Sequence, residues 1–438
     1  MQMQPWLTTQ EQEEVLENLI RFGGDLLKWD NARKLPLKSG GCTDIYINLR
    51  NERNSPLAAR YIAQIYRNPL LRLEPDVLAE VPDAVSGIAA HLSQLTRIPR
   101  ITIREKEKAG RATDGVIIGT ARAGQSVSIM DDVITDGKSK IVPYHKCHER
   151  GLKVGPLVVL VDRQQGWKKV FRENNIRMDV WPGMTLHDVR RFLINEGYMQ
   201  RCAAQAEEQN PLIIALDGKE WEDILPLVDV LRPMGCILKV NDLLFHEGME
   251  LIPNLQVYGR VMADLKNHDI PKTVENTCKR LRKYAPWAVT VHASGSGDMI
   301  SAAVAALEGT PTKVLAVTVL TSFDEKASKE VYNRRSIEEV RKLAWIAHQS
   351  GAHGLVCSPK EVAEMKKFYP RMTFVTPGVR SAGVDVADQK RVDTPAAALE
   401  SGADYLVMGR QILGAPDPTA EVHRLLKEEI WGAQYQEC

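Results

Sequence analysis

The sequence lacks long apolar runs and paired cysteine motifs. No 18 consecutive apolar residues occur among its 438 residues, so no transmembrane helix is expected. The seven cysteines are scattered and form no C-x-x-C pair, which argues for reduced thiols and against a zinc site or a disulfide framework. The first residues show no basic stretch before an apolar core, so no signal peptide is predicted. These absences predict a cytoplasmic protein with no membrane partner.

The chain also has no excess of charge of either sign. Its formal net charge is +1, which predicts no nucleic-acid partner but leaves room for local phosphate sites. Apolar residues make up 44% and charged residues 26%, the composition of a globular protein. The length exceeds that of one ordinary core, so two domains are expected.

The first half, residues 1–205, alternates short β-rich runs with helical segments. Apolar spacing predicts helices over 11–28 and 56–66, and DIYINLR (44–50) alternates like a strand. Further strands are predicted at 77–81, 100–104, 116–120, 126–133 and 154–162. The alternation favours an α/β domain with a largely parallel sheet. The small, polar stretch RCAAQAEEQNP (201–211) predicts the domain boundary.

The second half, residues 206–438, is more regular. Eight β-rich runs alternate with helix-like segments, which predicts a (β/α)8 TIM barrel. The runs are 211–217, 236–240, 255–265, 287–293, 312–320, 353–358, 372–378 and 403–409. Catalytic groups of such barrels lie at the carboxyl ends of the strands. The predicted ends are polar: Asp217, Lys239, Asp264, Lys266, Asp269, His292, Thr321, Ser358, Arg380 and Arg410.

Two lysines and two aspartates are expected to meet at one side of this barrel mouth. Lys239 ends one predicted strand, Asp264 and Lys266 alternate at the end of the next, and Asp269 follows before Ile-Pro. Singly, Asp269 reads equally well as a helix cap, and Asp264 with Lys266 as a structural ion pair. A buried array of alternating charge, however, is costly to desolvate and tends to be retained where preorganised charge serves chemistry. The array therefore predicts a catalytic centre.

The last two predicted strands carry an anion-binding pattern. TPGVR, with Arg380, and VMGRQI, with Gly409 and Arg410, follow strands seven and eight, where TIM barrels often bind phosphate. Glycine lets backbone N–H groups approach an anion, and arginine adds a forked donor. The alternative is that these arginines are merely solvent-exposed loop residues.

Residues 210–438 resemble orotidine 5′-phosphate decarboxylase, the enzyme of the last step of pyrimidine nucleotide synthesis. The motifs that carry the resemblance, in family order, are ALD (215–217), LKV (238–240), DLKNHDIPKT (264–273), VLTS (319–322), TPGVR (376–380), DQKRV (388–392) and MGRQI (408–412). The resemblance implies a cofactor-free decarboxylation of orotidine 5′-phosphate to UMP. A related family that uses a metal for sugar-phosphate chemistry is the alternative, which the I-P-x-T continuation and LTS disfavour.

The resemblance also implies roles for single residues. Lys239, Asp264, Lys266 and Asp269 match the family's alternating charge network. Lys266 would be the general acid that protonates C6 as CO₂ leaves, and Asp264 would lie against the substrate carboxylate. Asp269 would reach into the partner subunit's site, which implies a homodimer. The other implied contacts are Asp217 and Lys239 with the ribose hydroxyls, Thr273 and Thr321 with the ligand, and Arg380, Gln389, Gly409 and Arg410 with the phosphate.

The run SVSIMDDVITDGKSK (126–140) has the outline of a phosphoribosyl pyrophosphate loop. A predicted strand delivers two aspartates to a turn of small and hydroxyl residues that suits a 5′-phosphate; an ordinary strand and turn is the alternative. With LKSGGCTDIYINLR (37–50) and LVDRQQG (160–166), the run makes residues 10–200 similar to orotate phosphoribosyltransferase, an enzyme with a type I phosphoribosyltransferase-like α/β domain that uses Mg²⁺. The order of the halves is that of bifunctional uridine monophosphate synthases. The implied ligand contacts are Lys38, Arg104, Lys108, Asp131, Asp132, Thr135, Gly137, Ser139 and Arg163.

The N-terminal half departs from that family in three places. REKEKAGRATDG (104–115) has Glu105 in place of a lysine and lacks a histidine, Asp136 puts an anion beside the expected phosphate, and 80–90 has no glycine-rich turn. Each departure removes positive charge or close backbone approach from an anionic substrate. Two interpretations stay open: an active transferase, or a catalytically silent module for ligand binding or oligomerisation. Two dimerising halves in one chain allow a homodimer or a higher homo-oligomer.

Overall fold

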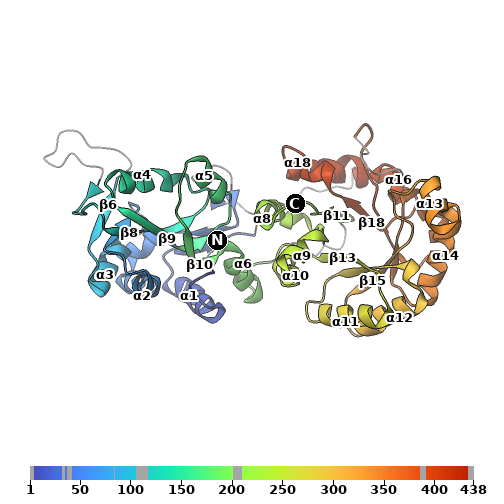
Figure 1. The fold of residues 1–438 in the computed structure, drawn as a ribbon, viewed down its shortest axis with the longest axis horizontal. Coiled ribbons are helices and arrows are strands. Elements are labelled where there is room, and N and C mark those ends of the chain that lie inside the picture. Colours follow the sequence, from blue (N-terminus) through green and yellow to red (C-terminus); the bar gives the residue numbers. More distant parts are fainter. Residues whose placement is uncertain are drawn as a thin grey trace. The chain divides into compact units, whose positions relative to one another are not determined.

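The computed structural model describes residues 4–31, 35–36, 42–82, 84–104, 117–200, 210–384 and 391–432. Contacts divide the chain into two compact units, residues 1–200 and 201–438 (Figure 1). The predicted boundary between residues 205 and 206 lies outside the described residues. The two units are described separately below.

The N-terminal unit is built on a six-stranded sheet with the order β10-β9-β8-β5-β6-β7. Its strands are β5 (Val77–Glu80), β6 (Arg100–Ile103), β7 (Ile117–Ile118), β8 (Ser126–Ile134), β9 (Lys153–Asp162) and β10 (Val180–Thr185). All neighbours are parallel except β7, which is antiparallel to β6. The sheet is therefore largely parallel, as the sequence predicts, although β10 was not among the predicted strands.

Helices cover both faces of this sheet (Figure 1). Leu16, Ile62, Ile88 and Val189 pack on one face, and Tyr144, Cys147 and Phe171 on the other. The helices are α1 (Thr9–Phe22), α2 (Pro56–Leu73), α3 (Ser86–Thr96), α4 (Ile141–Glu149), α5 (Trp167–Glu173) and α6 (Leu186–Asn195), with 3-10 turns at Leu49–Asn54 and Lys138–Lys140. Two short antiparallel pairs complete the unit: β1 (Leu27–Trp29) with β4 (Ile45–Ile47), and β2 (Leu35–Pro36) with β3 (Cys42–Thr43).

The predicted helix over 11–28 is wrong at its carboxyl end. The helix stops at Phe22, and Leu27–Trp29 is a strand. Gly23 and Gly24 have φ of +64° and +63°, a conformation that glycine adopts without steric cost. The Gly23 N–H closes the helix on the Ile20 carbonyl, so the apolar residues that follow are free to join a sheet.

The order of the strands reverses beside β5. The chain runs from β5 to β6 on one side and returns to place β8 on the other side of β5. In open parallel sheets such a reversal separates the flanking connections and leaves a crevice at the carboxyl ends of the strands, where ligands usually bind. The fold thus places a candidate ligand site between the ends of β5 and β8.

The C-terminal unit is a closed parallel barrel of eight strands, which confirms the prediction. The strands are β11 (Leu212–Ala215), β12 (Ile237–Val240), β13 (Val261–Asn267), β14 (Ala288–His292), β15 (Lys313–Val317), β16 (Gly354–Val356), β17 (Thr373–Thr376) and β18 (Tyr405–Met408). One predicted run, 255–265, starts too early, because its first residues end helix α10 (Leu251–Gln256) and the strand starts at Val261. Ile213, Met262, Leu315 and Val375 belong to the buried cluster that fills the barrel.

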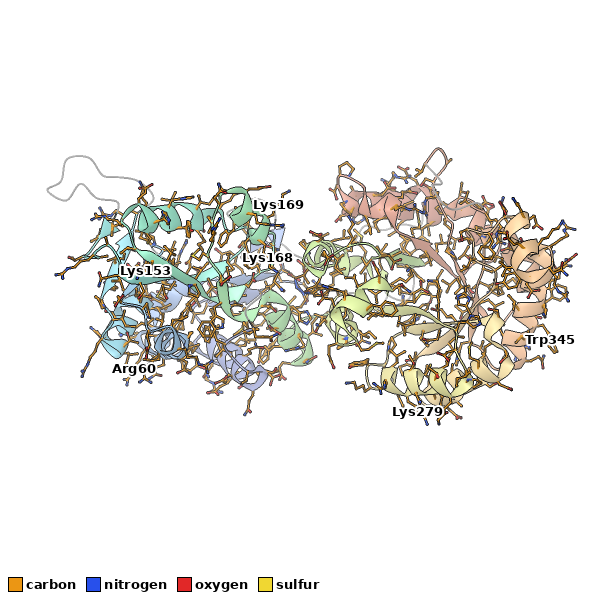
Figure 2. The ribbon with its side chains drawn as sticks, viewed as in Figure 1. Arg60, Lys153, Lys168, Lys169, Lys279 and Trp345 are labelled. Atoms are coloured by element: carbon orange, nitrogen blue, oxygen red, sulfur yellow. The ribbon has the colours of Figure 1, made fainter. Side chains whose placement is uncertain are left out.

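Helices surround the barrel (Figure 1). They are α8 (Trp221–Leu231), α9 (Asp242–Glu247), α10 (Leu251–Gln256), α11 (Pro271–Leu281), α12 (Gly297–Leu307), α13 (Glu325–Tyr332), α14 (Ser336–Gln349), α15 (Pro359–Phe368), α16 (Pro395–Glu400), α17 (Arg410–Leu413) and α18 (Pro418–Arg424), with 3-10 turns at Arg232–Met234 and Ala293–Gly295 and a π-helix at Leu425–Ile430. Their outer faces carry side chains such as Lys279 and Trp345 (Figure 2). Within the described ranges, no helix combines the length and apolarity needed to cross a bilayer.

Candidate active site

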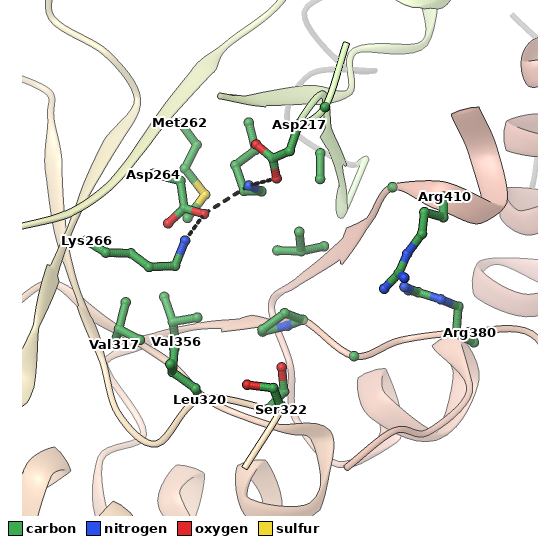
Figure 3. A pocket seen from close by; sticks show the side chains of 18 of the residues that line it. Asp217, Met262, Asp264, Lys266, Val317, Leu320, Ser322, Val356, Arg380 and Arg410 are labelled. Carbon is green, nitrogen blue, oxygen red and sulfur yellow. Dashed lines mark hydrogen bonds and ion pairs between the residues drawn. The ribbon is translucent and has the colours of Figure 1, made fainter. Parts of the chain in front are cut away.

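A cavity of about 710 Å³ opens at the carboxyl end of the barrel strands. Its two ends differ in charge (Figure 3). Asp217, Asp264 and Lys266 lie on one side, and Arg380 and Arg410 lie on the other. Apolar side chains between the two ends line the wall: Met262, Val317, Leu320, Val356 and Val407. The cavity therefore suits a ligand with an apolar or planar middle and a strongly anionic end.

The first end is a chain of alternating charges. Lys239 Nζ lies 2.5 Å from Asp217 Oδ2 and 2.9 Å from Asp264 Oδ2. Lys266 Nζ lies 2.6 Å from the same Asp264 oxygen. Lys239 and Asp264 are buried, whereas Lys266 is half-buried and faces the cavity. The structure thus brings together four of the residues that the sequence predicts for this site.

The two buried members of the array are both charged at neutral pH. Burial opposes ionisation of Asp264, but the ammonium groups of Lys239 and Lys266 outweigh it, and the pKa of the carboxyl is lowered. Burial likewise opposes the charge on Lys239, yet Asp264 and Asp217 raise its pKa. Mutual pairing therefore fixes a buried charge pattern that neither residue would keep alone.

The backbone of β13 is distorted where it presents Lys266. The register with β14 shifts between Ala263 and Asn267, and Lys266 has φ of +47°, in the left-handed region. This conformation costs a non-glycine residue roughly 1–2 kcal/mol, and such strain persists only where the surroundings enforce it. Here Thr290 on β14 does so, because its Oγ1 accepts the Lys266 N–H at 2.8 Å and donates to Asp264 Oδ1 at 2.9 Å.

Thr290 was not among the predicted site residues. Its side chain is fully buried and aligns both the aspartate and the lysine of the array. The available signal was a single hydroxyl in the otherwise apolar run AVTV of a predicted barrel strand. A polar residue on such a strand needs a partner, and that partner is the array.

The second end of the cavity combines two arginines with close backbone. Arg380 follows β17 and is buried, whereas Arg410 begins α17 and is exposed. A Cβ on Gly409 would lie 3.2 Å from atoms of Ala215, so this turn has little room for a side chain. Thr321, after β15, also lines the cavity. Gln389 lies outside the described residues.

Two predicted residues lie outside this cavity. Asp269 and Thr273 are exposed, and neither is among the lining residues. The Asp269 carboxylate accepts the N–H of Ile270 at 2.7 Å. Within one chain, both side chains are therefore free to face another molecule.

Comparison with known proteins assigns the barrel. Residues 210–425 match the family described as orotidine 5′-phosphate decarboxylase / HUMPS. Orotidine 5′-phosphate decarboxylases from Halorhodospira halophila and Thermobifida fusca are each 42% identical over 224 residues, which cover 50% of this chain and 94% and 95% of theirs. Through its barrel, the chain belongs to this family.

The chain is also similar to a solved structure. The orotidine 5′-phosphate decarboxylase from Lactobacillus acidophilus is 35% identical and covers 51% of this chain and 100% of its own, with a TM-score of 0.45. The decarboxylase-family match begins at residue 210, so it does not extend into the N-terminal unit.

The N-terminal unit has a cavity of its own, of about 700 Å³, at the strand reversal beside β5. It is lined by the end of β8 and the loop after it, by residues that follow β5, by Arg163 and by residues 46–48 and 50. It brings together seven of the predicted residues: Arg104, Asp131, Asp132, Thr135, Gly137, Ser139 and Arg163. The predicted Lys38 and Lys108 lie outside the described residues.

Several of these groups already have protein partners. Lys140, which was not predicted, forms a buried ion pair with Asp131. Asp136 accepts the Lys138 N–H and pairs with the Lys138 ammonium, both at 3.1 Å. Burial and the neighbouring Asp131 raise the pKa of Asp132 to about 7. In the loop after β8, charged groups are therefore paired with one another. A loop that is ready to bind phosphate would instead leave its donors unpaired.

Proposed function

We propose that the barrel converts orotidine 5′-phosphate into UMP and CO₂ without a cofactor. The observation that carries the proposal is a single cavity with the Asp217–Lys239–Asp264–Lys266 array at one end and two arginines at the other. The names of the relatives and the family membership support it. A nucleotide that bears a ring carboxylate and a phosphate matches both ends.

The charge array provides the chemistry at the ring. As the bond from C6 to the carboxylate breaks, its electron pair stays on C6, and the Lys266 ammonium stabilises it and then donates a proton. Lysine suits this role because it is a compact charge that can give up its proton and regain it from water. Asp264, kept ionised by Lys239, lies beside the departing carboxylate and disfavours its charge in the bound substrate.

The arginine end supplies binding energy far from the reacting atoms. Arg380 and Arg410 offer forked donors to a 5′-phosphate, and Gly409 allows the backbone to approach it. Binding energy at a remote group can hold the ring against the array and so favour the transition state. In this proposal Asp217 and Lys239 hold the ribose hydroxyls, and Thr321, which also lines the cavity, contacts the ligand.

The direct test is turnover by the full chain. Incubation with orotidine 5′-phosphate and a chelator is expected to release UMP and CO₂, measured by chromatography and by trapping of labelled CO₂. A matched incubation with a phosphorylated ketose and a divalent metal tests the sugar-phosphate alternative. UMP formation only in the first incubation supports the proposal, and product only in the second contradicts it.

We further propose that Asp269 and Thr273 complete the site of a partner subunit in a homodimer. Both are exposed on the segment that directly follows the array, and one chain leaves them unused. Lys266→Ala and Asp269→Asn are each expected to be nearly inactive alone. When the two variants are combined, dissociated and reassociated, half of the dimers contain one chain of each variant. Each of these dimers holds one intact site out of two, so about a quarter of wild-type activity should return. No recovery in verified mixed dimers would contradict the shared site.

For the N-terminal unit, we propose a cavity that binds a phosphorylated ligand. Its place at the strand reversal supports this, as do Arg50, Arg104 and Arg163 in its lining, which lie outside the Lys138–Asp136 and Lys140–Asp131 pairs. The resemblance extends the proposal to the transfer of a phosphoribosyl group from phosphoribosyl pyrophosphate to orotate, with Mg²⁺. The residues fit that ion poorly, because Lys140 already neutralises Asp131.

The same full-chain preparation separates the two interpretations of this unit. Orotate, phosphoribosyl pyrophosphate and Mg²⁺ are supplied together, and orotidine 5′-phosphate and UMP are measured. Formation of either product from orotate and phosphoribosyl pyrophosphate supports an active transferase. Product only from added orotidine 5′-phosphate supports a catalytically silent module.

A further inference from the structure

Arg391 is a buried cation behind the wall of the barrel cavity. It is 8% exposed and is not among the residues that line the cavity. One guanidinium nitrogen forms an ion pair with Glu361, in the first turn of α15. The other, Nη2, donates to the carbonyl oxygens of Val319 and Leu320, both at 2.8 Å. One side chain thus joins a helix to two consecutive peptide groups.

Those two peptide groups belong to the loop that lines the cavity after β15. Val319, Leu320, Thr321 and Ser322 all face it, and Figure 3 shows Leu320 and Ser322 beside the open space between the two charged ends. At its start the loop is tied to β16 through Thr318, which donates to the Val356 carbonyl. Beyond Thr318, the two hydrogen bonds from Arg391 Nη2 fix the orientation of the peptide groups just before Thr321.

Arg391 is also anchored through its own backbone. The Arg391 carbonyl accepts the hydroxyl of Ser358 at 3.3 Å, so the residue is held at the start of α15 by both its backbone and its side chain. Burial of a guanidinium is costly unless it is paired and its donors are used. Arg391 is paired with Glu361, and both terminal nitrogens of its guanidinium are used, whereas the buried Nε has no hydrogen-bond partner. The acceptors of Nη2 are main-chain atoms of the cavity wall.

We propose that Arg391 is a positioning residue that sets the wall formed by residues 319–322 against the ring and ribose of the substrate. The inference rests on the proposed decarboxylase function for the identity of that substrate. In the proposal the phosphate is held by Arg380 and Arg410, after β17 and β18. Arg391 also follows β17, but its guanidinium is directed away from that end, to the carbonyls of the loop after β15. Loss of the hydrogen bonds from Arg391 to Val319 and Leu320 should therefore weaken binding of the nucleoside part of the substrate and leave binding of the phosphate unchanged.

Arg391→Lys is the informative variant, because lysine keeps the charge beside Glu361 but has one nitrogen in place of Nη1 and Nη2, which serve Glu361 and the two carbonyls separately. We expect binding of UMP to weaken about 10-fold and kcat/KM to fall roughly 10–100-fold, since a small misplacement costs on this scale. Binding of ribose 5-phosphate, which tests the phosphate end, should change by less than about 2-fold. Amide hydrogen exchange in the full chain should become faster in residues 318–323 but not in the strands.

Arg341→Lys is the matched control. Arg341 pairs with Glu364 of the same helix α15, but its side chain is 53% exposed, so the same change should alter none of these measurements. Unchanged exchange in residues 318–323, or equal weakening of UMP and ribose 5-phosphate, would overturn the positioning role. The exchange measurement decides this even if wild-type protein fails to decarboxylate orotidine 5′-phosphate, a result that would overturn the proposed function alone.

Discussion

Replacing Lys266 with alanine is expected to lower the kcat of decarboxylation by about 10⁴-fold or more. The variant loses a general acid, a loss that costs roughly 10²–10⁴-fold, and a preorganised charge, which costs roughly 10²–10³-fold. Both act on the same carbanion, so the two effects overlap and are not multiplied in full. The measurement is single-turnover formation of UMP at saturating orotidine 5′-phosphate.

The barrel of this variant should stay folded. Asp264 keeps Lys239 at 2.9 Å and the Thr290 hydroxyl at 2.9 Å, so no buried charge is left unpaired. Removal of the side chain also leaves the phosphate end intact, and ribose 5-phosphate should bind as in wild type. Lys272→Ala, an exposed lysine of α11 paired with Glu275, is the control and should turn over normally. Near-normal turnover by Lys266→Ala would contradict its role as general acid.

The barrel and its charged mouth are predictable from the sequence because both depend on local patterns. Eight apolar runs separated by helical segments specify the strands, and polar residues at their ends specify the mouth. Lys239 and Asp264 fall on neighbouring strands, so their meeting follows from the barrel alone. Parallel register then brings their carboxyl ends to one edge.

The supporting residues are not predictable in this way, because their roles depend on contacts distant in sequence. Thr290 acts across a strand pair whose register shifts at a bulge, and the bulge has no sequence signal. Arg391 reaches carbonyls more than 70 positions earlier in the chain, and a carbonyl acceptor leaves no mark in a sequence.

The second large effect is expected for Asp264→Asn. Its kcat should fall roughly 10³-fold or more, because the change removes the charge beside the substrate carboxylate and releases Lys266 from its 2.6 Å contact. The KM for orotidine 5′-phosphate should not rise, since an anion that repels the bound substrate has been removed. Asp298→Asn, an exposed aspartate in the first turn of α12, is the control. A raised KM with unchanged kcat would instead make Asp264 a simple binding residue.

The difference in stability between wild type and Asp264→Asn should depend on pH with a defined sign. The pKa of Asp264 is lowered in the folded protein, so its contribution is complete above the unfolded value of about 3.9 and is lost as pH falls through the lower folded value. At pH 7 the variant should be destabilised by about 3 kcal/mol, the lower end for a broken buried pair, because Asp217 still neutralises Lys239. The gap between wild type and variant in denaturant titrations should then narrow below about pH 4. A gap that instead widens on acidification would mean that burial raises the pKa of Asp264 more than the two lysines lower it. That result would contradict the electrostatic account of the array.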